Sequence, residues 1–351
     1  MTGQPPGTSS RAVLRPANHR RAGMPRHHGH EPEAGGVFPP GTDFVYRQAG
    51  PTMLSRLVAM WRRRRRLSLV AAGDICVDKY AAHSRTFPGG QAFNFAVHAS
   101  RLGARTRLAG CVGTDFWGDW LLDRAAVAGI DAALCERRAG QSFITTVDHS
   151  AAGERRFIVE DEGATGGWGV SDTVLLAARE DADLLFLTPW ARAGIRLSLA
   201  RTMGRPFIAF DCMSLDNAAS LPAELPFVDF AFVPLGTAHD ELTLVRRVIS
   251  AGPPIVVVTR GERGSAVYSR GELVSERAPD ATTVVDTLGA GDGFAAAFCM
   301  TYLETGDISL AHAAATARAG RVCAHMGGTQ GPRGEWDAPA RRSRAARDGA
   351  G

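Results

Sequence analysis

The order of its segments predicts that this chain folds as an α/β domain, with a mostly parallel sheet covered by helices on both faces. Between residues 67 and 333, short runs that are apolar at almost every position alternate with helix-forming stretches. Runs of this kind are typical of strands that are buried on both faces. Strands and helices that alternate along a chain are the pattern of folds built on a parallel sheet.

The segments are bounded by residues that stop regular structure. The apolar run Leu67–Ala72 ends at Gly73 and Asp74, which predicts a short buried strand. The helix-forming stretches Ala92–Leu102 and Trp117–Ala128 are each followed by glycine, the usual residue just beyond a helix. Further strands are expected at Thr106–Val112, Leu184–Thr188, Phe207–Asp211, Phe230–Val233 and Ile255–Thr259, and the last two helices at Phe294–Leu303 and Leu310–His325.

Two stretches do not fit this alternation. They are the polar segment Lys79–Pro88 and the pair of strand-like runs Phe143–Asp148 and Arg155–Val159, joined by a turn at 151–153. We expect residues 79–88 and 142–160 to form a small separate sheet that acts as a lid. A hairpin at the edge of the main sheet is the alternative. Because an exposed lid strand can pair with a second copy, we also expect a homodimer through the lid.

The charges divide the chain into three parts. Its 351 residues include 40 basic and 36 acidic side chains, a formal net charge of +4. Residues 1–66 carry 12 arginines and 3 acidic residues, whereas residues 67–333 carry a net charge of −6. We therefore predict a disordered basic leader at 1–66, one folded domain at 67–333 and a disordered tail at 334–351. Since the folded part is acidic, no nucleic-acid partner is expected; a leader that contacts nucleic acid or anionic lipid is the alternative.

The composition excludes further classes of protein. Hydrophobic residues make up 45% and charged residues 22% of the chain, as in ordinary globular domains, and no apolar run is long enough to span a membrane. The six cysteines include no Cys-x-x-Cys pair. Because the sequence shows no secretion signal, free thiols in a reducing cytoplasm are the expectation.

A glycine-rich turn late in the chain is the strongest chemical signal. Residues 284–294 read Val-Val-Asp-Thr-Leu-Gly-Ala-Gly-Asp-Gly-Phe, and a helix-forming stretch follows. We expect a strand to enter this turn and a helix to leave it, so that backbone N–H groups and the helix N-terminus bind an anion. Asp292 would repel a bound phosphate, unless it accepts the proton of an attacking hydroxyl while the amides hold the transferring phosphoryl group. The alternative is that Asp292 caps the helix.

This turn differs from two common phosphate-binding loops. The chain contains no Gly-x-x-x-x-Gly-Lys-Ser/Thr sequence, and Phe294 stands where a Gly-x-Gly-x-x-Gly motif requires its third glycine. A dinucleotide-binding loop would also follow the first strand rather than lie near the end of the chain. A dehydrogenase is therefore not indicated.

An earlier glycine pair is the second candidate for a binding motif. Gly89 and Gly90 precede Asn94 at the start of a helix, and paired glycines let the backbone approach a ligand closely. Asp74 and Asp78, which follow the first strand, are suited to accept hydrogen bonds from sugar hydroxyls. A polar turn is the alternative for both.

Three motifs in this order resemble the ribokinase/PfkB family of sugar kinases. The Asp-Thr-x-Gly-Ala-Gly-Asp signature of that family is complete at residues 286–292, and the glycine pair with Asn94 is its second signature. The third is the strand, glycine turn and strand at residues 258–267, which alone would predict only a hairpin. The resemblance covers residues 67–331, and the amino-acid sequence at 73–80 is most similar to the fructoselysine 6-kinase branch.

The resemblance implies a ribokinase-like three-layer, doubly wound α/β fold with a small β lid, and an ATP-dependent carbohydrate kinase. Asp292 would be the base, and the amides of Gly289, Ala290 and Gly291 would form the anion hole. The sugar would be held by Asp78, Gly89, Gly90, Asn94 and Glu162, and the nucleotide by Thr259, Gly261, Gly264, Asp286, Thr287 and Thr316. Mg²⁺ would travel with ATP, and a monovalent cation such as K⁺ would lie near Asp286 and Thr287.

One feature of the resembled family is missing. Many members carry Asn-x-x-Glu, which helps to organise Mg²⁺, after the strand expected here at Phe230–Val233, where this chain has Pro-Leu-Gly-Thr. Asp240 or Glu241 is a possible substitute, so no metal ligand is assigned. The acceptor is expected to be a primary hydroxyl of a sugar or a fructosamine-like sugar–amine, and Trp190 either stacks on it or belongs to the core. A nucleoside or vitamin kinase of the same fold and a non-catalytic sugar-binding regulator are the alternatives.

Overall fold

The computed structural model describes residues 66–149, 155–201, 205–213, 215, 221–236, 240–280 and 283–329. The chain divides into two units, Met1–Gly50 and Pro51–Gly351, and every described residue belongs to the second. The expected leader, except for its last residue, the expected tail and the turn expected at 151–153 lie outside the described residues. Among the helices within the described ranges, none has the length and apolar character needed to cross a membrane.

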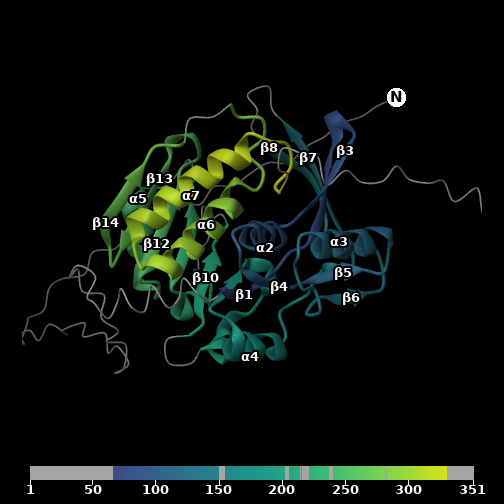
Figure 1. Cartoon of the computed structure of the whole chain (residues 1–351), viewed down its shortest axis with the longest axis horizontal. Coiled ribbons are helices and arrows are strands. Elements are labelled where there is room, and N and C mark those ends of the chain that lie inside the picture. The colour runs from purple at the N-terminus through teal and green to yellow at the C-terminus, as the bar shows by residue number, and fades with distance from the viewer. Residues whose placement is uncertain are drawn as a thin grey trace, which may run out of the picture. The chain divides into compact units, whose positions relative to one another are not determined.

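Eight strands form the main sheet, in the order β14-β13-β12-β11-β10-β9-β1-β4 (Figure 1). Their bounds are β1 Ser68–Ala72, β4 Arg105–Ala109, β9 Leu184–Leu187, β10 Phe207–Asp211, β11 Phe230–Pro234, β12 Ile255–Thr259, β13 Ser265–Ser269 and β14 Glu272–Arg277. Neighbouring strands pair in parallel through β4, β1, β9, β10, β11 and β12, whereas β13 and β14 run antiparallel at one edge. This confirms the predicted fold class.

Helices cover both faces of this sheet because its strands are apolar on both faces. Leu69 and Ala71 pack into a core cluster under α2, α3, α6 and α7, while Val70 and Ala72 pack into a second cluster under α4 and α5. Burial of a large apolar side chain contributes about 1.5–3 kcal/mol, so the two clusters stabilise the three layers. The helices are α2 Gln91–Arg101, α3 Phe116–Val127, α4 Asp172–Asp181, α5 Glu241–Ser250, α6 Ala290–Thr305 and α7 Ile308–Cys323. The shorter 3-10 helices are η1 Ala81–His83, η2 Gly163–Thr165, η3 Pro189–Ala191, η4 Gly194–Ala200, η5 Leu225–Phe227 and η6 Gly261–Arg263.

A second sheet of four strands, hereafter the small sheet, has the order β3-β2-β7-β8. Its strands are β2 Cys76–Tyr80, β3 Arg85–Gly89, β7 Phe143–His149 and β8 Arg155–Asp161. Because β7 pairs with β2 and not with the main sheet, the strand-like runs do not form the edge hairpin that was the alternative. Asp78 lies within β2, so the small sheet begins before the polar segment from which it was predicted.

The strand predicted at Thr106–Val112 is wrong as a single element. It divides into β4 and β5 (Cys111–Gly113), and β5 pairs with β6 (Glu136–Arg138) in a separate two-stranded sheet. The break falls at Gly110, where a Cβ atom would lie 2.6 Å from Ile75 Cδ1 and 2.7 Å from Gly73 O. The tight packing of Gly110 on the neighbouring crossover, rather than a local break in the apolar pattern, therefore ends the first strand.

The strand predicted to enter the glycine-rich turn is also wrong. Residues 283–287 have no strand structure, and Val284 and Val285 are 58% and 46% exposed. The backbone N–H groups of Val285 and Asp286 both donate to the carbonyl of Cys323, the last residue of α7. The segment therefore lies against the end of a helix, and its β-branched residues face solvent instead of a sheet.

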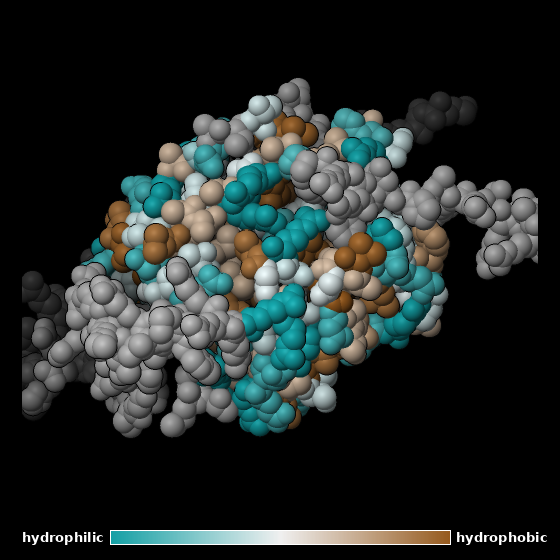
Figure 2. Space-filling model, in the orientation of Figure 1, coloured by the Kyte–Doolittle hydropathy of each residue, from teal (hydrophilic) through white to brown (hydrophobic). Residues whose placement is uncertain are grey.

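The visible surface carries no broad apolar face. In Figure 2 hydrophobic residues lie in small groups among hydrophilic ones. Exposed apolar side chains occur, for example, at Leu273 and Val274 of β14 and at Phe116 of α3. Scattered apolar residues of this kind are normal on globular domains.

Candidate active site

The glycine-rich turn forms the N-terminus of α6, as its small residues predict. Gly289 adopts φ +73°, and a Cβ atom there would lie 2.4 Å from Gly328 Cα, so only glycine fits. Gly291, two residues on, is exposed, and a Cβ atom there would meet nothing within 4 Å. The N–H of Ala290 donates to the carbonyl of Thr287 at 3.3 Å. Open space therefore adjoins the helix N-terminus on the side of Gly291.

Asp292 lies within the first turn of α6 and is only 7% exposed. Because Gly289 holds the N-cap position, Asp292 does not cap the helix, which excludes that alternative. The Asn94 Nδ2 atom donates to Asp292 Oδ2 at 2.9 Å. The fold thus brings together the two motifs that the sequence placed far apart, the glycine pair with Asn94 and the glycine-rich turn.

Asp78 is a buried carboxylate on β2 of the small sheet. Its Oδ1 atom accepts hydrogen bonds from the Thr145 hydroxyl and, at 3.3 Å, from the Cys76 thiol. A Cβ atom on Gly89 of the neighbouring strand would lie 1.8 Å from Asp78 Oδ2, so the glycine makes room for the carboxylate. These contacts fix the direction of Asp78 in the absence of any ligand.

The Asp74 carboxylate connects the start of α2 to Thr188. Its carboxylate accepts from the N–H of Gln91 at 2.7 Å, at the start of α2, and from the Thr188 hydroxyl at 3.0 Å. Burial raises the pKa of Asp74, and these hydrogen bonds act against that rise. Gly90, with φ +97°, passes so close to the backbone of Asp74 that a Cβ atom would lie 2.5 Å from its carbonyl oxygen. Asp74 therefore orients the helix that carries Asn94.

Asp286 is buried and joins three segments of the chain. Its Oδ1 accepts from the N–H of Leu288 at 2.9 Å, and its Oδ2 accepts from the Tyr80 hydroxyl at 2.5 Å and from the N–H of Gly327 at 2.8 Å. Tyr80 belongs to the small sheet, and Gly327 follows α7. Sequence reasoning missed both residues, although Gly327 and Gly328 form a glycine pair like the one at residues 89 and 90.

His98 of α2 holds the segment after α7 in place. Its Nδ1 lies 2.8 Å from an Arg318 guanidinium nitrogen and its Nε2 lies 3.0 Å from Gly328 O. Because a guanidinium only donates, Nδ1 accepts and Nε2–H donates, which requires a neutral ring. Burial first, and the Arg318 charge second, lower the pKa of His98 to about 3.

Glu162 follows β8 and lies beside η3. Its Oε2 atom is 3.7 Å from an Arg192 guanidinium nitrogen, and both side chains are about half exposed. Trp190 of η3 is partly buried, and its ring packs on Phe143 of β7 with the ring centroids 5.2 Å apart. The ion pair of Glu162 and Arg192 therefore links the end of β8 to the end of η3. Trp190 of η3 also contacts the small sheet, through Phe143.

Most of the residues expected at the nucleotide site lie on β12, on the turn that follows it, and on α7. Thr259 ends β12, and Gly261 (φ +59°) has open space where a Cβ atom would be. Gly264 (φ +84°) would place a Cβ atom 2.1 Å from Arg277 O, which only glycine avoids. The Thr316 hydroxyl donates to His312 O at 2.9 Å within α7. Thr287, a residue of the glycine-rich turn, is partly buried.

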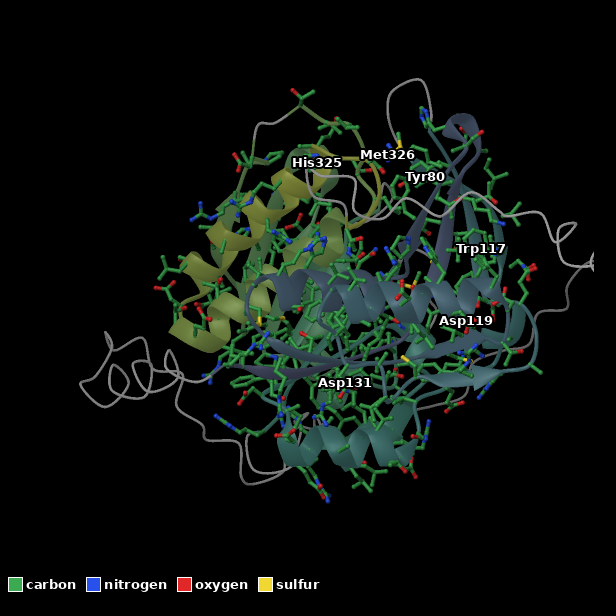
Figure 3. The ribbon with its side chains drawn as sticks, turned by 45° about the vertical axis from the view of Figure 1, so that its right-hand side comes forward. Tyr80, Trp117, Asp119, Asp131, His325 and Met326 are labelled. Carbon is green, nitrogen blue, oxygen red and sulfur yellow. The ribbon has the colours of Figure 1, made fainter. Side chains whose placement is uncertain are left out.

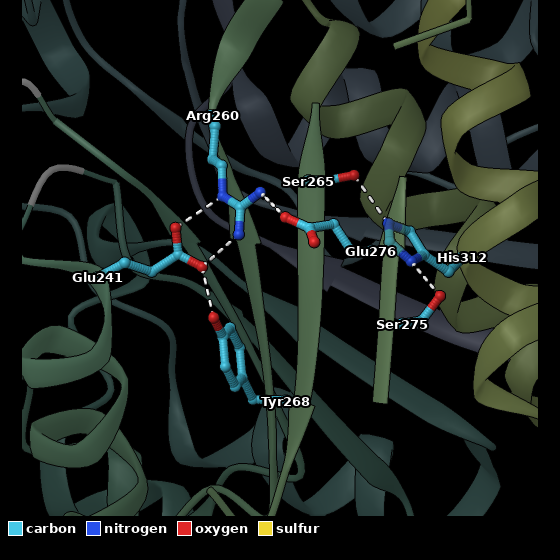
Figure 4. A network of polar contacts seen from close by, with 7 residues as sticks. All are labelled: Glu241, Arg260, Ser265, Tyr268, Ser275, Glu276 and His312. Carbon is cyan, nitrogen blue, oxygen red and sulfur yellow. Dashed lines mark hydrogen bonds and ion pairs between the residues drawn. The ribbon is translucent and has the colours of Figure 1, made fainter. Parts of the chain in front are cut away.

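Figure 4 shows a polar network that surrounds Arg260, next to Gly261. Arg260 bonds both oxygens of Glu241 at 2.6 Å and Glu276 at 2.5 Å, and the Tyr268 hydroxyl donates to Glu241 at 2.6 Å. Burial and the Glu241 carboxylate raise the pKa of Tyr268 to about 12. The carboxylate of Glu241, one possible substitute for the missing family glutamate, is thus bound by two protein groups, while that of Asp240 caps α5.

The chain is a doubly wound α/β domain in which a buried aspartate lies at a glycine-rich helix N-terminus beside a small sheet, and such a site can bind an anion and accept a proton. A family model described as pfkB family carbohydrate kinase matches residues 68–189 and 224–333. The chain belongs to this family of carbohydrate kinases and is a phosphotransferase of that class.

Individual relatives narrow the comparison. The chain is 30% identical over 264 residues to fructoselysine 6-kinase of Escherichia coli K12, a match that covers 74% of this chain and 98% of that protein. It is 28% identical over 270 residues to fructosamine kinase FrlD of Bacillus subtilis 168, covering 74% and 92%. A crystal structure of a putative ribokinase II from E. coli, solved with ATP and Mg²⁺, superposes with a TM-score of 0.60 at 19% identity, covering 76% of this chain and 95% of that one. This structural likeness supports the same fold.

Proposed function

We propose that the protein transfers the γ-phosphoryl group of ATP to a primary hydroxyl of a sugar or a fructosamine-like sugar–amine. The observation that carries this proposal is the contact between Asn94 and Asp292 beside the open N-terminus of α6. It places a polar group suited to a sugar hydroxyl, a carboxylate suited to accept a proton, and amides suited to an anion in one place. The relatives named as fructoselysine and fructosamine kinases support the class of acceptor.

In the proposed reaction, Asp292 accepts the proton of the acceptor hydroxyl as the hydroxyl oxygen attacks the γ-phosphorus. A bond forms between that oxygen and phosphorus, the bond from phosphorus to the β,γ-bridging oxygen breaks, and ADP leaves with the electron pair. The backbone N–H groups of Gly289 and Gly291 would stabilise the charge on the transferring group, with Gly291 beside the open space. The N–H of Ala290 would join them by leaving its 3.3 Å bond to Thr287 O. The positive end of α6 adds to this stabilisation.

The sugar would lie between the small sheet and the start of α2. Asp78, which accepts a hydrogen bond from Thr145, would also accept hydrogen bonds from hydroxyls of the sugar. Gly89 and Gly90 would let the backbone approach the sugar ring. We propose that Glu162 reaches the acceptor from the side of the small sheet, which serves as a lid. The primary amine of a fructosamine's amino acid part would suit a carboxylate here.

The nucleotide would lie near Thr259, Gly261, Gly264 and Thr316, where Gly261 leaves space. In the described ranges no group of three or more His, Cys, Asp or Glu side chains could hold a metal ion. Mg²⁺ bound with a nucleotide needs only one or two carboxylates besides the phosphates and its waters. Mg²⁺ would therefore arrive with ATP, where it neutralises phosphate charge. The carboxylate of Asp286 hydrogen-bonds within the protein, and we assign no step to a monovalent cation there or at Thr287.

A panel of acceptors tests this proposal. The purified protein with ATP and Mg²⁺ would be given fructosamines, ketoses and nucleosides, and ADP release would be followed. We expect the largest kcat/KM with a fructosamine and a product that carries a phosphate ester on its primary hydroxyl, as phosphorus NMR would show. Turnover confined to nucleosides would favour the nucleoside kinase alternative, and tight sugar binding without turnover would favour the regulator.

We further propose that the enzyme works in the cytoplasm, where ATP is available, as a dimer through the small sheet. One of the two edge strands of that sheet is β8, where Ile158 and Val159 are about half exposed. An edge strand of this kind can pair with a second copy. Light scattering at micromolar concentration should give the mass of two chains, and the mass of one chain would overturn the dimer.

A further inference from the structure

The hydroxyl of Tyr80 connects the small sheet to the catalytic turn. Tyr80 is 1% exposed and Asp286 is 0% exposed, and their hydrogen bond spans 206 residues of chain. In Figure 3 Tyr80 lies beside the segment that carries His325 and Met326. The same carboxylate accepts from Leu288, one residue before Gly289, and from Gly327. A single buried side chain therefore receives bonds from β2, from the turn and from the segment after α7.

Close contacts surround the segment that contains Gly327 and Gly328. A Cβ atom on Gly327 would lie 2.9 Å from the Phe87 ring, and a Cβ atom on Gly328 would lie 2.6 Å from Asn94 Nδ2. The Phe87 ring meets the Tyr80 ring edge to face, with the ring centroids 5.2 Å apart. Strand β3 thus lies close to Gly327 through Phe87, and β2 is linked to Gly327 through Tyr80 and Asp286.

Tyr80 and the proposed sugar ligand Asp78 lie on one strand, two residues apart, so their side chains share a face of the small sheet. A movement of β2 toward a bound acceptor would carry the phenol with it. Because the phenol is bonded to Asp286, and Asp286 to the N–H of Leu288, this movement would reach the amides that precede α6. In this scheme Tyr80 acts through Asp286, to which its hydroxyl donates.

From this geometry we propose that Tyr80 is a positioning residue, which couples the sugar-binding strand to the anion-hole turn through its bond to Asp286. The coupling rests on the proposed function for its use in catalysis, but the bond itself orders the turn in the free protein. Loss of the hydroxyl would loosen the turn and lower the rate of phosphoryl transfer, while the acceptor and the nucleotide would still bind.

Tyr80→Phe tests this proposal, because it removes one oxygen and keeps the ring contact with Phe87. Hydrogen exchange by mass spectrometry on the free protein should show amides of residues 286–292 that exchange at least about tenfold faster than in the wild type. With ATP and the best acceptor, kcat should fall at least about tenfold, with both KM values within about twofold. Tyr268→Phe is the matched control, since it removes another phenol-to-carboxylate bond, 2.6 Å long, whose partner is Glu241 of α5 and not the turn.

The control should leave both the exchange of residues 286–292 and kcat unchanged. Unaltered exchange of that peptide in Tyr80→Phe would overturn the coupling, whatever the kinetics show. A variant with faster exchange, in a protein that phosphorylates none of the acceptors, would leave the coupling intact and refute the proposed function instead. If Tyr80→Phe and Tyr268→Phe lose thermal stability and speed up exchange of the turn equally, Tyr80 has only a general structural role.

Discussion

The side chains of Asn94 and Asp292 are hydrogen-bonded at 2.9 Å, although 198 residues separate them in the chain. The bond joins the first turn of α2 to the first turn of α6, so that two helix N-termini meet at one point. In this bond the Asn94 amide donates and the Asp292 carboxylate accepts. The contact also holds Asp292 Oδ2 in a fixed direction before any substrate binds.

Replacement of this carboxylate should separate binding from chemistry. Asp292→Asn keeps the size of the side chain, and we expect kcat to fall by about 10²–10⁴-fold while ATP affinity stays within about twofold. Steady-state kinetics and calorimetric titration with an ATP analogue would measure the two effects. Asp307→Asn, at the N-cap of the next helix, makes the same change of charge and should keep its turnover. Near-normal kcat in Asp292→Asn would falsify the assignment of the base.

The two glycines of the turn should respond to substitution in opposite ways. The space beside Gly291 accepts a side chain, so Gly291→Val should fold with little change in Tm but should lose at least about a hundredfold in kcat, because the side chain fills the place of the phosphoryl group. Gly289→Ala should instead lower the free energy of unfolding by about 1–3 kcal/mol, because its φ is positive and its Cβ atom would collide with Gly328. Chemical denaturation and kinetics on both variants check this. A Gly291→Val enzyme that keeps its rate would contradict the anion hole.

The two aspartates near the first strand should also differ. Asp78→Asn removes a proposed acceptor of sugar hydroxyls, so we expect kcat/KM for the sugar to fall about 10–100-fold with the KM for ATP unchanged. Asp74→Asn weakens the bonds to Gln91 and Thr188 and should lower Tm more than it changes the sugar KM. Initial-rate measurements at varied acceptor, together with thermal melts, distinguish the outcomes. Equal effects of both variants on the sugar KM would argue against a direct contact from Asp78.

Stability should decline as the solution is acidified, because of two buried histidines. Burial lowers the pKa of His98 to about 3 and that of His312 to about 4, whereas both titrate near 6.5 when unfolded. Below pH 6.5 the two histidines bind protons in the unfolded chain but stay neutral in the native protein. The free energy of unfolding therefore falls as pH falls. Each histidine can contribute a slope of up to about 1.4 kcal/mol per pH unit.

Urea denaturation of wild type and His98→Gln between pH 7 and pH 4.5 isolates the contribution of His98. The difference in unfolding free energy between the two proteins should shrink toward acid pH, because only the wild type carries that histidine. Parallel curves would show that His98 does not resist protonation in the native state. The carboxylates titrate in both proteins, so their contribution cancels in the comparison.

The sequence predicted the buried strands of the main sheet and the helices near the motifs because these segments are apolar or helix-forming over their whole length. It did not predict β14, whose side chains are mostly exposed. It failed where a distant contact decides the structure. The run at 106–112 looks continuous, yet Gly110 packs against Ile75 and the strand divides there. The valines at 284 and 285 favour a strand, but the end of α7 takes their backbone hydrogen bonds.

The candidate site was predicted in its composition but not in its support. Local spacing identified Asn94 and the turn at 286–292, since glycines and carboxylates there have a chemical purpose that can be argued from type alone. Tyr80 and the glycine pair at 327 and 328 were missed because a tyrosine in a strand and two glycines after a helix are common. Only the tertiary structure shows that these residues meet at Asp286.

The support of the turn has a consequence for the order in which the enzyme is made. Gly327 and Gly328 follow every strand and helix described in the chain, yet Asp286 and Gly289 depend on them for their contacts. A ribosome therefore completes the sheets before it releases the residues that brace the turn. The turn can therefore reach its final arrangement only after Gly327 and Gly328 have been made.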